Sequence, residues 1–297
     1  MQTERSPDAT IVTRLRCQLR GAVVRTVSGE ESSVPVQAHA EEFRSPGTGE
    51  NAAVGVLLSH GFTGSPWSMK PFAEHLAAEG YGVAVPRLPG HGTSWQEMNK
   101  TSWPDWYAVL DNEFERLRKE HDQVFLVGLS MGGCLVLRLA EQHGADISGL
   151  VLINPSVRTD DKRLTLLPVL SRLVPSFPGI SNDIKKPGID ERAYDRMPLR
   201  ALHSLSQLWK VTRDDLAKIT QPVLLFRSTV DHVVEPSSGR TVLSSISSRD
   251  VTETLLEDSY HVATLDNDAP RIFADSTAFI GRLSQPQIEP ENEPSDA

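Results

Sequence analysis

The sequence has few cysteines, no long apolar segment and no basic cluster, and each absence excludes a class of protein. Cys17 and Cys134 are the two cysteines among 297 residues, too few for a disulfide framework or a cysteine-bound metal cluster. No apolar run approaches the roughly 18 residues of a membrane-spanning helix. The charged first 25 residues do not have the pattern of a secretory signal. With 39 acidic against 30 basic residues the net charge is −9, so we expect a cytoplasmic globular protein that binds no nucleic acid.

Motifs of several cofactor and metal enzymes are also missing. No Gly-x-Gly-x-x-Gly opens a helical pattern, no Gly-Lys-Ser/Thr phosphate loop occurs, and His-Glu-x-x-His is absent. No cluster of His, Cys and Asp has the spacing of a metal site. We therefore expect neither a cofactor nor a metal.

Short apolar runs alternate with longer helical patterns along the chain. The runs are continuous, which is typical of strands buried on both faces of a parallel sheet; they cover residues 54–58, 82–85, 124–127, 150–153, 223–226 and 254–256. Ser65 and Pro66 indicate the start of one helix, Ser102 and Pro104 the start of another, and a third helix is expected over residues 130–143. This alternation predicts an α/β fold with a mostly parallel central sheet and helices on both faces.

One connection and the two ends depart from this pattern. Residues 158–221 are too many for a plain crossover between two strands, so we predict an inserted cap. Its apolar first half, residues 164–177, is compatible both with helices packed on the sheet and with the lining of an apolar substrate pocket. We expect a flexible N-terminal extension over residues 1–33, the main domain over 34–284, and a disordered acidic tail over 285–297.

The strongest chemical signal is Gly128-Leu129-Ser130-Met131-Gly132, between an apolar run and a helical pattern. In this pattern the serine occupies a strained strand-to-helix turn, and side chains at the two glycines would collide with neighbouring backbone. The helix dipole then points at any negative charge formed beside the serine. We predict Ser130 as a nucleophile, against the alternative of a glycine-rich turn whose serine has no chemical role.

A nucleophilic serine needs a base and an orienting acid, which in this architecture follow in the order Ser, Asp or Glu, His. Asp231 follows the run at 223–226, and His261 follows the run at 254–256. Because the carboxyl ends of parallel strands share one edge of a sheet, both can reach Ser130. The local alternatives to Asp231 are Glu235, Glu257 and Asp258.

An oxyanion hole needs two backbone N–H donors. We expect one from Met131, directly after the nucleophile, and the other from Phe62 in the glycine-rich loop after the first buried run. His60 and His91 lie in tight loops at the same edge and are interpreted as structural. Cys134, one helical turn beyond Ser130, is interpreted as a buried core thiol.

With these residues assembled, the chain resembles the α/β-hydrolase superfamily, and it is most similar to bacterial monoacylglycerol lipases and related small carboxylesterases. The resemblance covers roughly residues 36–283 and is carried by His60-Gly61-Phe62-Thr63-Gly64-Ser65-Pro66, by residues 86–93 and 128–133, by Asp231-His232-Val233-Val234, and by residues 259–266. In those lipases a cap covers the acyl pocket and helps to recognise glycerol. The resemblance therefore implies substrate contacts at Ile180 and Glu191.

The predicted function is hydrolysis of monoacylglycerols to fatty acid and glycerol through an acyl-enzyme, by a serine esterase of lipid metabolism. A general short-chain carboxylesterase is the alternative within enzymes. A catalytically silent hydrolase-fold protein that binds a ligand is the alternative from another class. The expected partner is a small ester, with transient contact between the cap and a lipid surface.

Overall fold

The computed structural model describes residues 34–285. The predicted N-terminal extension and all but the first residue of the predicted tail lie outside the described residues. The helices and strands below belong to the compact unit that begins at Val36.

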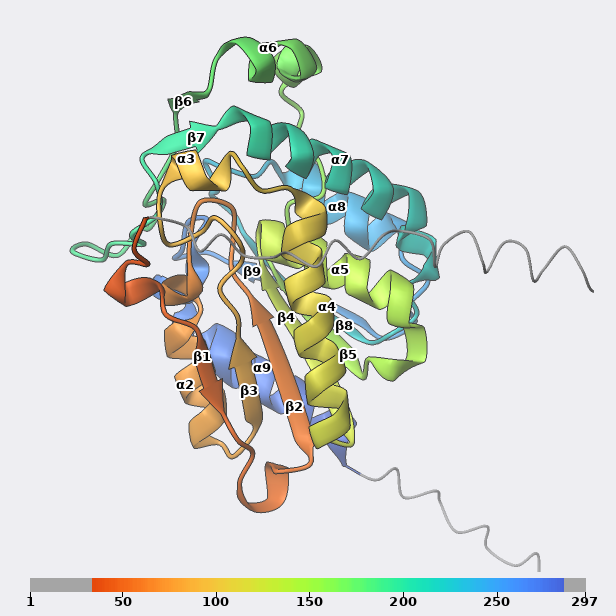
Figure 1. Cartoon of the computed structure of the whole chain (residues 1–297). Coiled ribbons are helices and arrows are strands. Elements are labelled where there is room, and N and C mark those ends of the chain that lie inside the picture. Colours follow the sequence, from red (N-terminus) through yellow and green to blue (C-terminus); the bar gives the residue numbers. More distant parts are fainter. Residues whose placement is uncertain (1–33, 286–297) are drawn as a thin grey trace, which may run out of the picture. The chain divides into compact units, whose positions relative to one another are not determined.

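A seven-stranded sheet forms the centre of this unit (Figure 1). In spatial order its strands are β1 (Phe43–Ser45), β3 (Gly82–Val85), β2 (Val54–Ser59), β4 (Gln123–Leu129), β5 (Gly149–Ile153), β8 (Val223–Ser228) and β9 (Val251–Leu256). Only β1 at the edge is antiparallel to its neighbour; the other pairs are parallel. The prediction of a mostly parallel sheet is confirmed, and the six predicted runs coincide with β2, β3, β4, β5, β8 and β9.

Helices cover both faces of the sheet (Figure 1). One face carries α4 (Trp103–Glu120), α5 (Met131–His143) and α8 (Pro236–Ser245), and the other carries α2 (Lys70–Ala78) and α9 (Ala269–Ser284). The short elements are α3 (Trp95–Met98) and the 3-10 helices η1 (Ala38–Ala40), η2 (Gly49–Asn51), η3 (Pro66–Ser68), η4 (Gly144–Asp146) and η7 (Ala263–Leu265).

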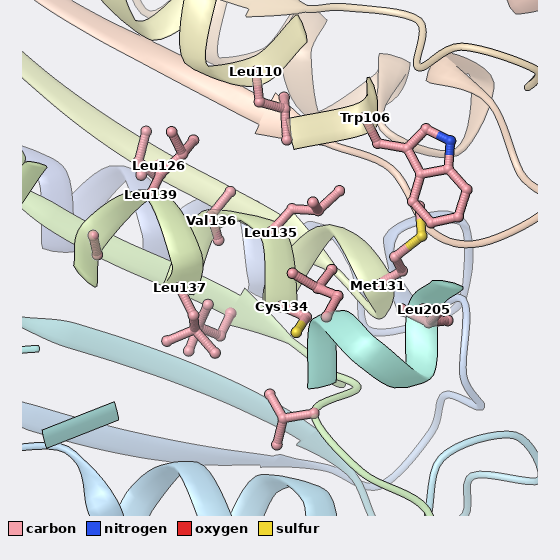
Figure 2. Packing of buried hydrophobic residues seen from close by; sticks show 14 of the residues in the cluster. Trp106, Leu110, Leu126, Met131, Cys134, Leu135, Val136, Leu137, Leu139 and Leu205 are labelled. Carbon is pink, nitrogen blue, oxygen red and sulfur yellow. The ribbon is translucent and has the colours of Figure 1, made fainter. Parts of the chain in front are cut away.

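Alternate residues of the central strands belong to two separate apolar cores. Leu57 and Leu126 face the core that contains α5, whereas Val56 and Val127 face the core that contains α2 and α9. Figure 2 shows the first core around α5, with Trp106 of α4 among its members. Burial on both faces explains why the strands read as continuous apolar runs.

Local sequence sets where the helices begin. Helix α4 begins where Ser102 and Pro104 predicted a helix start, and Ser102 forms a capping box there with Asp105. The helix predicted from Ser65 instead begins as η3 and continues as α2. Pro71, which has no N–H, stands in the first turn of α2, where a missing donor costs no intrahelical hydrogen bond.

The chain between β5 and β8, residues 154–222, is called the β5–β8 connection below. It contains η5 (Lys162–Leu166), α6 (Leu167–Leu173), β6 (Ser176–Pro178), β7 (Arg196–Pro198), α7 (Leu199–Asp215) and η6 (Leu216–Lys218). β6 and β7 pair with each other as a separate two-stranded sheet. Of the two interpretations of the apolar first half, packing on the sheet does not hold for α6, which packs against α7 (Figure 1).

Candidate active site

The three predicted side chains follow strands that lie close together in the sheet. Ser130 comes directly after β4, Asp231 shortly after β8, and His261 shortly after β9, and the spatial order is β4-β5-β8-β9. The His261 Nδ1–H donates to Asp231 Oδ2 over 2.8 Å. Ser130 and His261 line the same cavity. The sheet therefore brings the three together.

Ser130 has a backbone conformation that a residue with a side chain rarely adopts, with φ 55° and ψ −118°. Two hydrogen bonds to the end of β5 and to the loop after it hold it there: its N–H donates to the Ile153 carbonyl, and Ser156 N–H donates to its carbonyl, each over 3.0 Å. The side chain stands at the start of α5, where the helix dipole favours negative charge.

The glycines on either side of Ser130 are required by close packing of backbone. A Cβ at Gly128 would lie 2.5 Å from the Gly132 carbonyl, and a Cβ at Gly132 would collide with the Ser59 carbonyl oxygen. The steric argument made from the sequence is thus confirmed.

The Asp231 carboxylate is fully engaged by its own loop and by His261. Its Oδ1 accepts hydrogen bonds from the N–H groups of Val233 and Val234, both over 2.8 Å. Burial alone would raise the pKa of Asp231, but the charge and hydrogen bond of His261, together with the two N–H donors, lower it below its usual value. Asp231 is therefore ionised.

The nearby carboxylates are bonded elsewhere. Glu235 accepts from the Thr159 hydroxyl over 3.0 Å, and Asp258 pairs with Lys185 Nζ over 2.6 Å. Of these side chains, Asp231 alone hydrogen-bonds to the His261 ring within the described residues.

The His261 ring is buried, and its electrostatics are set by acidic groups. Burial lowers the pKa of His261, but the charge and hydrogen bond of Asp231, followed by the charges of Glu191 and Asp183, raise it to a net value above the usual one. Because Nδ1–H donates to Asp231, the neutral ring carries its lone pair on Nε2. That nitrogen is the one available to accept a proton.

The loop after β2 lies against the predicted nucleophile. The position of a Cβ on Gly61 is 3.4 Å from Ser130 Cβ, and the next residue, Phe62, lines the cavity with Ser130 and His261. Met131 is the first residue of α5, where backbone N–H groups have no intrahelical acceptor. Phe62 thus lies in the same cavity as Ser130, and Met131 follows Ser130 directly in the chain.

His60 and His91 support these loops and carry no charge. His60 Nδ1–H donates to the Gly61 carbonyl over 3.0 Å, and Leu88 N–H donates to His60 Nε2 over 3.3 Å. Burial lowers the pKa of His60 to about 4 and that of His91 well below its usual value. Cys134 is buried, donates to the Thr212 hydroxyl and has a pKa raised to about 12 by burial. All three side chains have the structural settings that the sequence analysis assigned to them.

Two cavities of different character meet at Ser130. The smaller, about 70 Å³, is also lined by His261, Ile180 and Glu191. The larger, about 620 Å³, is lined by Phe62, by several polar residues, and by apolar side chains of the β5–β8 connection, which are Leu164, Leu167, Leu170, Phe177, Pro178, Ile180, Met197, Leu199, Leu202, Leu205 and Trp209. Both predicted substrate contacts therefore face the site, and the second interpretation of residues 164–177, an apolar lining, fits the geometry.

Residues 50–268 match the Hydrolase_4 family model, described as serine aminopeptidase, S33. The chain belongs to this family. A thermostable monoacylglycerol lipase from Bacillus sp. (strain H-257) is 41% identical over 84% of this chain and 97% of its own length. A carboxylesterase from Bacillus subtilis (strain 168) is 26% identical over 77% of this chain and 92% of its own.

Solved structures place this Hydrolase_4 member in the α/β-hydrolase fold, as predicted. A structure reported for the metagenome-derived lipolytic enzymes LipS and LipT has a TM-score of 0.80 and 40% identity, covering 84% of this chain and 100% of that one. A monoacylglycerol lipase from Paleococcus ferrophilus has a TM-score of 0.68 and 23% identity, covering 82% and 100% of the two chains. The predicted resemblance to bacterial monoacylglycerol lipases and carboxylesterases is confirmed.

Two side chains beside the catalytic loops of this hydrolase were not found from the sequence. Asn154, with φ 44°, donates from its amide to the His261 carbonyl over 2.8 Å and accepts from Ser228 N–H over 2.7 Å. An Asn-Pro pair directly after a buried strand is a turn signal that could have indicated it. Asp183 contacts both loops from the β5–β8 connection, and no local pattern marks it.

The structure contains no helix among residues 34–285 that is long and apolar enough to cross a membrane.

Proposed function

We propose that this chain hydrolyses the ester bond of monoacylglycerols to fatty acid and glycerol. The observation that carries the proposal is the position of Ser130, between a large apolar cavity and a small cavity lined by an acidic side chain. An acyl chain fits the first and a polar alcohol the second. The names of the relatives support the same substrate class.

The proposed chemistry proceeds in two halves. His261 Nε2 accepts the proton of the Ser130 hydroxyl as its oxygen attacks the ester carbonyl, and the alcohol leaves with that proton. A water that gives one proton to His261 then attacks the acyl-enzyme; the bond to Ser130 Oγ breaks, His261 returns the proton to that oxygen, and the fatty acid is released. The backbone N–H groups of Phe62 and Met131 stabilise the oxyanion in both halves, and Asp231 keeps the imidazole in its working tautomer and stabilises its protonated form.

The alcohol side of the site suits a group with free hydroxyls. Glu191 is 8% exposed, and burial raises its pKa above the usual value. Its Oε2 accepts a hydrogen bond from Asn182 N–H over 3.4 Å, and the carboxyl can accept a further one from a glycerol hydroxyl. With a volume of about 70 Å³, this cavity leaves no room for a second acyl chain, so di- and triacylglycerols are expected to be poor substrates.

Residues 158–221 serve in this proposal as a cap over the acyl cavity. Three apolar side chains of its first half that do not line the cavity face solvent: Leu166 is 61%, Val169 57% and Leu173 74% exposed. Exposed apolar side chains grouped beside a cavity for an acyl chain favour transient contact with a lipid surface.

A substrate series tests the proposal. Mono-, di- and triacylglycerols of one fatty acid are compared with its methyl ester and with an aminoacyl anilide, and Ser130→Ala is the blank. Turnover of the monoacylglycerol well above the other substrates is expected. Turnover of short activated esters alone would identify a general carboxylesterase instead. Preference for the anilide would identify an aminopeptidase. Failure to react with a fluorophosphonate would identify a catalytically silent binding protein.

A further inference from the structure

Asp183 contacts the loops of both the proposed acid and the proposed base. Its Oδ2 accepts from the backbone N–H of His261 and from that of His232, each over 3.2 Å, and its Oδ1 accepts from His232 Nδ1–H over 2.7 Å. His232 is the residue next to Asp231. The Asp183 side chain is 10% exposed. One carboxylate from the β5–β8 connection therefore joins two loops that follow different strands.

Backbone hydrogen bonds continue this attachment on both sides of His261. Val262 N–H donates to the Asp183 carbonyl over 3.1 Å. In the opposite direction, the buried carboxylate of Asp266 accepts from the N–H groups of Lys185 and Lys186 over 2.7 and 2.8 Å, and from Tyr260 N–H over 2.8 Å. The chain at residues 183–186 is thus bonded to His261, Val262 and Asp266, and Asp266 in turn holds Tyr260.

We propose that Asp183 is a positioning residue, which fixes the separation of the Asp231 and His261 loops and places a negative charge beside the base. The inference rests on the proposed hydrolase function. The hydrogen bond between Asp231 and His261 needs its two loops within a few tenths of an ångström of their positions. Asn154 holds the His261 loop from the β5 side, and Asp183 holds both loops from the side of the β5–β8 connection.

The charge of Asp183 has a second effect. The acidic groups whose charges act on the His261 ring are Asp231, Glu191 and Asp183. His232 is bonded to Asp183, and its ring centroid lies 4.8 Å from that of Tyr260. A carboxylate near the ring favours the imidazolium that forms during acylation. Removal of this charge should therefore make the base weaker without changing the residues that contact the reacting atoms.

The experiment compares Asp183→Ala and the isosteric Asp183→Asn with the control Asp195→Asn. Asp195 is an exposed carboxylate of the same connection, and its side chain makes no hydrogen bond within the described residues. The substrate is a soluble p-nitrophenyl ester, measured for kcat, KM and the pH dependence of kcat/KM. The low-field proton resonance of His261 Nδ1–H, followed by NMR against pH, reports the Asp231–His261 bond without turnover.

In Asp183→Ala we expect kcat to fall about tenfold or more, with KM changed by less than about twofold. Asp183→Asn keeps an acceptor oxygen and should recover most of this kcat at high pH. The acidic limb of the kcat/KM profile of Asp183→Asn should move to a lower pH by about half a unit, because the negative charge is gone. Asp195→Asn should match the wild type in all three measurements.

Wild-type kcat and pH dependence in Asp183→Ala would overturn the inference, as would a loss confined to KM, which would make Asp183 a substrate contact. An unaltered low-field resonance in both Asp183 variants would overturn it as well. A wild-type protein that neither turns over the ester nor reacts with a fluorophosphonate would instead refute the proposed function. The NMR comparison still decides in that case whether Asp183 positions the pair.

Discussion

The strained backbone at Ser130 predicts a difference in stability between two variants that both lose activity. A non-glycine residue in this part of conformational space costs about 1–3 kcal/mol, and at φ 55° and ψ −118° Ser130 carries that cost. Alanine at 130 keeps the Cβ and the strain, whereas glycine removes both. Both variants lack the Ser130 hydroxyl, so the comparison between them isolates the backbone.

The expected difference follows from two opposing contributions. Glycine relieves about 1–3 kcal/mol of backbone strain in the folded state. Its greater conformational freedom in the unfolded chain destabilises the folded state by about 0.5–1 kcal/mol. Ser130→Gly should therefore be up to about 2.5 kcal/mol more stable than Ser130→Ala. For a domain of this size that corresponds to a Tm higher by up to about 10 °C.

Thermal unfolding of the two variants, followed by circular dichroism, measures this difference. Asn112, an exposed residue within α4, provides the matched control. At that helical position glycine should be about 1 kcal/mol less stable than alanine. Both variants at 130 should lose turnover by a factor of about 10⁴ or more. If glycine at 130 is less stable than alanine, as at 112, the strain argument is wrong.

Three further results are expected. Asp231→Asn should lower kcat by about 10⁴ while the Tm changes little, because the amide favours the wrong tautomer of His261; a loss below tenfold in steady-state assays would contradict the assigned role. Since the pKa of His261 is raised above its usual 6.5 and the base must be neutral, kcat/KM should fall as the pH drops through a midpoint above 6.5; a pH–rate profile with a lower midpoint would refute this. Gly132→Ala places a Cβ against the Ser59 carbonyl, so the purified variant should show a lower Tm and no reaction with a fluorophosphonate.

The parts of the fold that the sequence predicted are those with local causes. Strands β2, β4, β5 and β8 are buried on both faces, so their sequences are unbroken apolar runs. The turn at Ser130 was predictable because the two glycines that it requires are next to it in the chain. Asp231 and His261 were found from their order along the chain and from the shared edge of a parallel sheet.

What was missed depends on contacts between distant residues or on very short elements. β1, β6 and β7 have three residues each, too few for a hydrophobic period to be recognised. Asp183 is far from His232 in sequence and meets it only because the β5–β8 connection folds back over the sheet edge. The packing of α6 on α7 was likewise not predictable, since an apolar helix face does not reveal which surface covers it.

The two cavities that meet at Ser130 set the order in which the alcohol product leaves and the hydrolytic water enters. Once an ester is cleaved across that point, its acyl chain still occupies the larger compartment and blocks that approach to the carbonyl. The hydrolytic water must then arrive through the smaller compartment, which becomes accessible when the alcohol departs. The alcohol product and the hydrolytic water therefore use the same compartment. An alcohol that stays in it attacks the acyl-enzyme and re-forms the ester before water can hydrolyse it.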